Sequence, residues 1–293
     1  MASIVDALLS EVTRPLTPIF ASVGISTFLW AISVGQFVRY FRGHFEDSRG
    51  LVIFLGICML LSTLQFVDVV YFFYFQVIRC RLPVNLPQIA TARRIVAANF
   101  LHYILTALTQ GFYAVRIWHV TNRKGVLFAI IGFLSFVQLA AGIACTVNTA
   151  IIDSAFAVYD RFSHIAQGIA SGTGLLCDII ITIALVRFLQ TRWSAFQGTR
   201  LALDKMVISA VNIGLLTSIF AILILITWLS APQDTFLWTS FYYPAGQIYV
   251  NSILVCLNAR QSLRAELRSA KGRHLHTFEL DDFQGGSRIS RAI

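Results

Sequence analysis

The chain has 293 residues, of which 57% are hydrophobic and only 13% are charged, and its net charge is +9. Because ordinary soluble domains carry about 25% charged residues, this composition excludes a typical soluble domain and indicates a protein embedded in lipid. The basic residues stand in short clusters between apolar runs, which is typical of membrane topology and excludes a nucleic-acid-binding face.

Seven apolar stretches are long enough to cross the roughly 30 Å hydrocarbon core, which needs about 20 helical residues. Lipid cannot satisfy backbone N–H and C=O groups, so each stretch is predicted to be a helix. Short connections predict sequential antiparallel neighbours in an all-α integral membrane fold, a seven-transmembrane helix bundle over residues 16–259. The predicted spans are Leu16–Val38, Leu51–Ile78, Ile95–Val115, Val126–Ile152, His164–Val186, Met206–Ala231 and Thr235–Ala259.

The distribution of basic residues predicts the orientation of the bundle. Of the 23 lysines and arginines, 17 lie on one side of the predicted spans and six on the other. Since basic residues concentrate on the cytoplasmic side, we expect residues 1–15 to be extracellular or lumenal and residues 260–293 to be cytoplasmic. The main exception is the outer connection between the second and third spans, which carries four arginines. The membrane is expected to be the plasma membrane or an endomembrane.

The segment after the seventh span combines basic and apolar periodicity. Arg260, Arg264 and Arg268 repeat every four residues, and Leu263 and Leu267 lie on a different face. This pattern predicts a short amphipathic juxtamembrane helix on the inner leaflet. The polar, glycine-containing sequence after residue 272 predicts a largely disordered tail. The basic loops and the tail are the expected contacts with the lipid bilayer and with a cytoplasmic protein partner.

One carboxylate interrupts the fifth predicted span. Asp178 stands in the apolar run "LLCDIIITIAL", and the helix rise places it roughly 21 Å below the outer end of that span. A charge at such depth costs at least ~2.5–3.5 kcal/mol, so Asp178 should face the bundle interior. Amides at similar depth in three other spans could donate hydrogen bonds to it. The resulting inner polar layer consists of Gln110, Asp178, Asn212 and Asn251.

Two interpretations of the inner polar layer remain open at this point. The amides and the carboxylate could serve only to fix the register of the packed helices, since individual polar contacts of this kind are worth about 0.6–2 kcal/mol in membranes. The layer could instead form an ion or proton site or a conformational switch.

A second, looser polar set lies nearer the predicted outer end of the bundle. It could line an outward-open pocket for a small-molecule ligand, or its members could be scattered residues satisfied by the backbone or by each other. Asp68 and His102 lie at comparable depth, which would allow them to pair. The candidate outer pocket consists of Gln65, Asp68, Asn99, His102 and Gln167. The third span continues as a polar stripe of Asn99, His102, Thr106, Thr109, Tyr113 and Arg116.

The sequence lacks the residues that several chemical functions require. Only Lys124, Lys205 and Lys271 are lysines, and none lies in a predicted span, which excludes a retinal Schiff base. The sequence has no P-loop, HExxH or GxSxG motif. His102 and His164 are too few for a typical three-ligand zinc site. We therefore expect no enzymatic activity, no metal site and no cofactor.

Three motifs in the last three predicted spans resemble a family of fungal seven-span proteins, chiefly from basidiomycetes, that is known only as a domain of unknown function. They are "CDIIIT" (Cys177–Thr182), "NIGLLTS" (Asn212–Ser218) and "QIYVNSILVCLNAR" (Gln247–Arg260). The earlier "GQFVRYF" (Gly35–Phe41) also fits the family, whereas Gln247 stands where lysine is common in it. The resemblance implies a membrane protein with the same topology and brings no established activity.

These observations predict a multi-pass membrane protein that acts as a receptor-like sensor of a small ligand. The outer pocket would bind the ligand, and the inner layer around Asp178 would be the switch. One alternative is a transporter or proton-coupled channel that uses Asp178, and another is a structural membrane protein without a ligand. A path past Asp178 would favour transport, an outer cavity above a closed inner end would favour sensing, and the absence of any cavity would favour a structural role.

Overall fold

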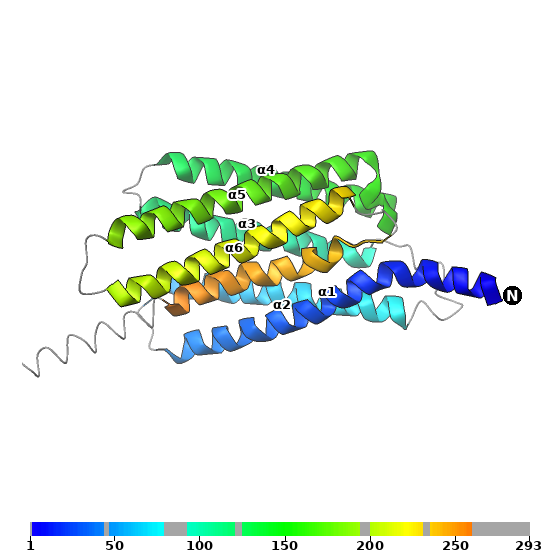
Figure 1. Ribbon diagram of the computed structural model, residues 1–293, viewed down its shortest axis with the longest axis horizontal. Helices are drawn as coiled ribbons and strands as arrows, with labels where there is room; N and C mark the ends of the chain where they lie inside the picture. Colours follow the sequence, from blue (N-terminus) through cyan, green and yellow to red (C-terminus); the bar gives the residue numbers. More distant parts are fainter. Residues whose placement is uncertain are drawn as a thin grey trace, which may run out of the picture.

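In a computed structural model the chain forms one bundle of long helices (Figure 1). The structure describes residues 2–43, 47–78, 93–120, 125–193, 200–230 and 235–259. Within these ranges it leaves out the side chains of residues 2–15, 93–95, 120, 155–156, 188–193 and 200–213. The predicted juxtamembrane helix and tail, residues 260–293, lie outside the described residues.

The all-α fold is confirmed, and the described ranges contain no strand. A last helix covers residues 239–259 and is called the 239–259 helix below. α1 begins well before the first predicted span, so that residues 2–15 continue its helix. The other elements are α1 (Ala2–Arg42), α2 (Arg49–Val77), α3 (Arg93–Val120), α4 (Gly125–Ile152), the 3-10 helix η3 (Ala155–Tyr159), α5 (Arg161–Trp193) and α6 (Arg200–Ser230).

Within the described residues four helices are long and apolar enough to cross a membrane, fewer than the seven predicted spans. The four segments are Leu16–Arg42, Arg49–Val77, Gly125–Ile152 and Arg161–Arg187. α3 falls short because it carries a polar stripe, and that stripe is directed into the protein rather than toward its surroundings. Its buried members are Asn99, His102, Thr106, Thr109 and Tyr113.

The bundle presents apolar side chains outward and polar side chains inward. Ile151, Phe136 and Phe28 are 76%, 69% and 67% exposed, whereas Gln65 and Gln110 are each only 1% exposed. Soluble proteins show the reverse preference, and they rarely expose extended apolar surface. This distribution suits a protein whose surroundings are lipid, and together with the four apolar helices it identifies a membrane protein.

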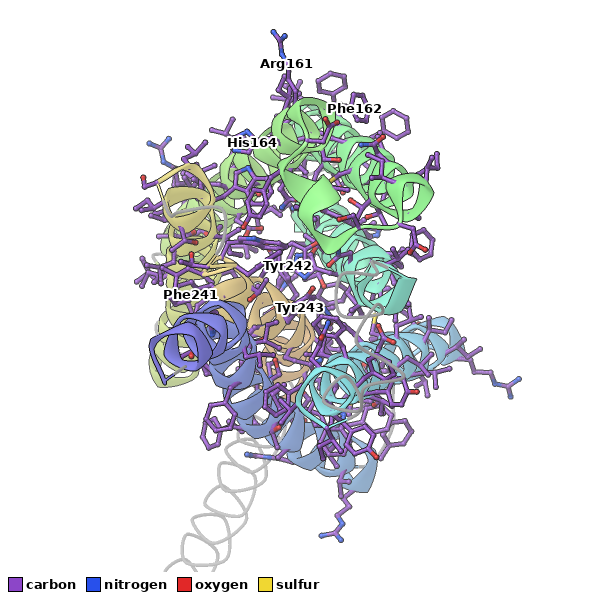
Figure 2. All side chains as sticks on the ribbon, turned by 90° about the vertical axis from the view of Figure 1, so that its right-hand side faces the viewer. Arg161, Phe162, His164, Phe241, Tyr242 and Tyr243 are labelled. Carbon is purple, nitrogen blue, oxygen red and sulfur yellow. The ribbon has the colours of Figure 1, made fainter. Side chains whose placement is uncertain are left out.

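The 239–259 helix lies at the centre of the bundle. Each of the helices α1 to α6 contacts the next one in sequence, and α3 also contacts α5. In the end-on view of Figure 2 these helices surround the 239–259 helix, with Tyr242 and Tyr243 directed toward the middle. Residues 242–254 of this helix are all buried. A helix surrounded in this way can use every one of its faces for a contact.

Side-chain hydrogen bonds attach the 239–259 helix to α1 in a fixed register. Ser240 donates to the carbonyl of Pro18, Asn251 to that of Leu29 and Asn258 to that of Gln36, at 3.2, 2.9 and 3.0 Å. The two partners are separated by 222 residues in every pair. Because this separation is constant, α1 and the 239–259 helix run in the same direction.

Close packing between α3 and α4 depends on a glycine. Gly142 faces the ring of Tyr103, and a Cβ at that position would overlap the ring atoms. We predict that Gly142→Ala lowers the free energy of unfolding by about 1–3 kcal/mol, as overpacking of a core does. Chemical unfolding in detergent micelles would measure this change.

Gly132→Ala provides the matched control in the same helix, because a Cβ at Gly132 meets nothing within 4 Å. It should leave stability unchanged or raise it slightly, since alanine has the higher helix propensity. Equal stabilities of the two variants would contradict the described packing of α3 against α4.

Candidate functional site

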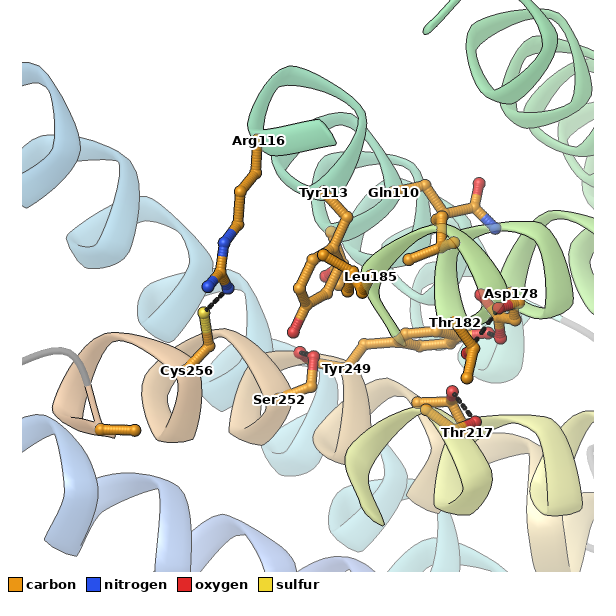
Figure 3. A pocket seen from close by; sticks show the side chains of 14 residues that line it. Gln110, Tyr113, Arg116, Asp178, Thr182, Leu185, Thr217, Tyr249, Ser252 and Cys256 are labelled. Atoms are coloured by element: carbon orange, nitrogen blue, oxygen red, sulfur yellow. Dashed lines mark hydrogen bonds between the residues drawn. The ribbon is translucent and has the colours of Figure 1, made fainter. Parts of the chain in front are cut away.

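A cavity lies inside the bundle between α3, α5, α6 and the 239–259 helix (Figure 3). It extends from Asp178 toward the carboxyl ends of α3, α5 and the 239–259 helix, which is the predicted cytoplasmic end. We call it the inner cavity. Its polar and charged lining comprises Thr109, Gln110, Tyr113 and Arg116 from α3, Asp178 and Thr182 from α5, Thr217 from α6, and Tyr249, Ser252 and Cys256 from the 239–259 helix.

Asp178 lies at the closed end of the inner cavity. Its side chain is only 4% exposed, and the Tyr249 hydroxyl donates a hydrogen bond of 2.7 Å to its Oδ2 atom. The amide of Gln110 also lies within reach of the carboxylate. A buried charge needs such partners because the interior cannot solvate it. The carboxylate therefore faces the interior, in contact with two other helices.

Gln110 connects this end of the cavity to α4. Its Nε2 atom donates to Oε1 of Gln138 at 2.7 Å, while its own Oε1 atom has no hydrogen-bond partner. The side chain is 1% exposed and lines the cavity. An unsatisfied buried acceptor in a cavity wall is a position where a bound molecule could donate a hydrogen bond.

The two asparagines of the predicted inner polar layer, Asn212 and Asn251, are not shown to contact Asp178. Asn251 donates to the carbonyls of Leu29 and Gln247, at 2.9 and 3.0 Å, and so faces α1 rather than Asp178. Asn251 and Tyr249 are two residues apart, which places them on nearly opposite sides of a helix with 3.6 residues per turn. The side chain of Asn212 lies outside the part of the chain that the structure describes.

The other end of the inner cavity carries a positive charge. Arg116 is half-buried, and its Nη1 atom donates to the sulfur of Cys256. A thiol is a weak acceptor compared with a carboxylate. Among the described residues no carboxylate forms an ion pair with Arg116, and no group of three His, Cys, Asp or Glu side chains is arranged to hold a metal ion. Figure 3 shows Tyr113 and Ser252 between the Arg116 end and the Asp178 end.

A second cavity lies on the other side of Tyr249, toward the predicted outer end. We call it the outer cavity. It is lined by residues of α3, α4, α5, α6 and the 239–259 helix, and Tyr249 lines both cavities. The ring of Tyr249, hydrogen-bonded to Asp178, therefore stands where the two cavities meet.

The candidate outer pocket is only partly brought together. His102 and Gln167 line the outer cavity, where the Tyr103 hydroxyl donates to Oε1 of Gln167. The ring of His102 packs against that of Tyr242 at a tilt of 33°, with ring centroids 3.9 Å apart, and its Nδ1 atom has no hydrogen-bond partner. The expected pair with Asp68 is not found among the described residues. The remaining candidates, Gln65, Asp68 and Asn99, line neither the inner nor the outer cavity.

These three residues lie between α2, α3 and the 239–259 helix. Asn99 accepts a hydrogen bond of 3.1 Å from the Tyr243 hydroxyl. Gln65 is packed against Gly246, where a Cβ would overlap its amide. Both amide atoms of Gln65 and the Oδ2 atom of Asp68 are buried without a hydrogen-bond partner.

Two residues that shape the site carried no usable signal in the sequence. Tyr249 and Gln138 each stand in an apolar run, and a tyrosine in such a run is counted with the apolar residues. The heptad separation of Tyr242, Tyr249 and Cys256 places them on one helix face, but that spacing is shared by many buried positions. The stripe of the third span was a better guide, because Thr109, Tyr113 and Arg116 do line the inner cavity.

Comparison with known proteins adds a partial family match. Residues 174–262 match a family of unknown function, DUF6534. This segment holds the three motifs of the sequence resemblance and contributes most of the lining of the inner cavity, including Asp178 and Tyr249. Searches of curated proteins and of solved structures gave no match. The chain is thus a membrane protein of unknown activity.

The contact between Tyr249 and Asp178 can be tested through stability. We predict that Tyr249→Phe lowers the free energy of unfolding by about 1.5–3 kcal/mol, the value of a hydrogen bond to a charged group. Tyr243→Phe, which removes the bond to the neutral Asn99, should lower it by only about 0.5–1.5 kcal/mol. Chemical unfolding in micelles measures both variants.

A double-mutant cycle with Asp178→Asn isolates the pair, because Tyr249→Phe should lose much of its effect once the charged acceptor is gone. Tyr243→Phe should have the same effect with either residue at position 178. Independence of the Tyr249→Phe and Asp178→Asn effects would show that the hydroxyl does not donate to the carboxylate.

Proposed function

We propose that this membrane protein is a carrier that passes a small polar solute between the two faces of the bilayer. The observation that supports this proposal is the pair of cavities that approach each other from opposite halves of the bundle and meet at Tyr249. A protein with only a structural role needs no such cavities. The geometry therefore favours transport over the receptor-like function that the sequence suggested first.

The contact at the meeting point suits a carrier better than an open channel. The ring of Tyr249 separates the cavities, and a single hydrogen bond of 2.7 Å holds it to Asp178. A solute that donates its own hydrogen bond to Asp178 would compete with the tyrosine hydroxyl. Because the net value of one such bond is small, about 1.5–3 kcal/mol for a charged partner, binding of the solute can offset its loss and release the ring.

The proposal includes seven membrane spans with the chain's amino end outside and its carboxyl end in the cytoplasm. The parallel course of α1 and the 239–259 helix supports an odd number of crossings. α3 and the 239–259 helix would cross in spite of their polar residues, because those residues face the interior. The basic residues support the orientation.

The same proposal places the protein in the plasma membrane or an endomembrane, without enzymatic activity. The basic inner loops and the tail would contact anionic lipid and a cytoplasmic protein partner. From the motif resemblance we further infer a fungal origin.

Sensing is the second candidate function, and one observation favours it. His102 lines the outer cavity with an unpartnered Nδ1 atom, and its ring lies 6.5 Å from that of Tyr249. A ligand bound at His102 could shift Tyr249 and so change the inner cavity without crossing the membrane. Such a protein would bind its ligand but would show no saturable flux.

Uptake into vesicles tests the carrier proposal. The full-length protein would be reconstituted into liposomes and supplied in turn with radiolabelled glycine, glucose and uridine, which represent three classes of small polar solute. We predict saturable uptake of at least one of them, slowed on the order of tenfold by Asp178→Asn, which corresponds to a loss of about 1.4 kcal/mol.

Tyr243→Phe serves as the control, because Tyr243 is buried and hydrogen-bonded but lines neither cavity. It should retain the uptake rate of the wild type. Absence of saturable uptake of all three solutes by folded protein, or wild-type uptake by Asp178→Asn, would contradict the proposed function.

A further inference from the structure

The inner cavity has an acidic side chain at one end and a basic side chain at the other. Asp178 lies at the closed end and Arg116 near the carboxyl ends of the surrounding helices. Asp178 is held by an uncharged tyrosine and Arg116 by a thiol. Among the described residues neither side chain has a partner of opposite sign in the cavity wall. A bound molecule that carries both signs would supply such partners.

Ligands with a single charge do not fit this arrangement. An anion placed on Arg116 would leave Asp178 without a counter-charge, and a cation placed on Asp178 would leave Arg116 without one. Unpaired charges in a poorly solvated cavity are costly. A molecule with a positive and a negative end would satisfy both protein groups at once, and its ammonium group could also donate to the unsatisfied Oε1 atom of Gln110.

The spacing of the two ends sets the size of the molecule. Arg116 follows Gln110 by six residues, and Cys256 follows Tyr249 by seven, so the helix rise separates the two ends by about 9–10.5 Å. A hydrogen bond of about 3 Å at each end leaves roughly 4 Å between the charges of the ligand. This separation suits a short amino acid and excludes a long diamine or dicarboxylate.

We propose that the inner cavity binds a small amino acid as a zwitterion, with its carboxylate on Arg116 and its ammonium group on Asp178. Tyr113 and Ser252 lie beside the middle of the ligand. The inference deepens the proposed function, since it names the solute class of the carrier. It also predicts which end of the solute competes with Tyr249, namely the ammonium group.

Binding to the full-length protein in lipid nanodiscs tests the assignment without any need for transport. The probes are β-alanine, its methyl ester, which lacks the negative charge, and N-acetyl-β-alanine, which lacks the positive charge. Calorimetry should show that wild-type protein binds β-alanine at least tenfold more tightly than either derivative, a difference of about 1.4 kcal/mol. Equal binding of the three probes, or no binding of β-alanine, would overturn the proposal.

Two variants assign the ends of the ligand. Arg116→Gln should make β-alanine and its methyl ester equal in affinity, while Asp178→Asn should make β-alanine and its N-acetyl derivative equal. Arg39→Gln is the matched control, because Arg39 is an exposed arginine of α1 outside the cavity, and it should leave all affinities unchanged. Retention of the full preference for the zwitterion by both Arg116→Gln and Asp178→Asn would overturn the assignment.

The same measurements separate this inference from the carrier proposal. Zwitterion-selective binding without flux would contradict transport and support the site. Saturable flux of glucose or uridine, with no binding of amino acids, would support transport and overturn the site.

Discussion

The hydrogen bond from Tyr249 to Asp178 is the interaction on which the interior of this protein depends. A carboxylate deep in an apolar bundle is tolerated only where donors reach it, and here a tyrosine from the central helix provides the shortest contact, 2.7 Å. The same ring forms a wall of both cavities. Tyr249 therefore both stabilises the buried carboxylate and separates the two cavities. A change in its hydrogen bond to Asp178 would also change whether the cavities connect.

The central position of the 239–259 helix makes this arrangement possible. One side of the helix is held to α1 by hydrogen bonds in constant register, and Gln247 exchanges hydrogen bonds with Ser62 of α2 at 2.5 and 3.0 Å. The opposite side carries Tyr249, Ser252 and Cys256 into the inner cavity. Because the first side is anchored, movement of Tyr249 can occur in its side chain rather than in the whole helix.

Much of the fold could be predicted from the sequence because lipid imposes strong rules. Apolar length predicted the helices, and the charge on Asp178 predicted that it faces inward, since no lipid-facing position could accommodate it. Gln110 was predicted at the same depth, and it is buried beside Asp178. The helices α3 and 239–259 are less clear in the sequence, because polar residues needed inside the bundle lower the apolar character that marks a membrane span.

The partners of Asp178 could not be predicted in the same way. The depth of Asn251 in the bundle is close to that of the carboxylate. Depth does not tell which neighbouring helix a side chain points toward when its own helix is buried on all sides. The rotation of the 239–259 helix about its axis decides which of Asn251 and Tyr249 meets α5, and packing against α1 fixes that rotation. Gln138 was missed for a similar reason, because a single amide in an apolar helix does not reveal which neighbour it contacts.

Accessibility of single cysteines to a membrane-impermeant thiol reagent tests the central claim most directly. The five native cysteines would first be replaced by alanine, and new cysteines would be placed at Ser252 in the inner cavity and Ser171 in the outer cavity. We predict that the reagent labels position 252 only from the side of the carboxyl terminus and position 171 only from the opposite side. Labelling of both positions from the same side would contradict a barrier at Tyr249.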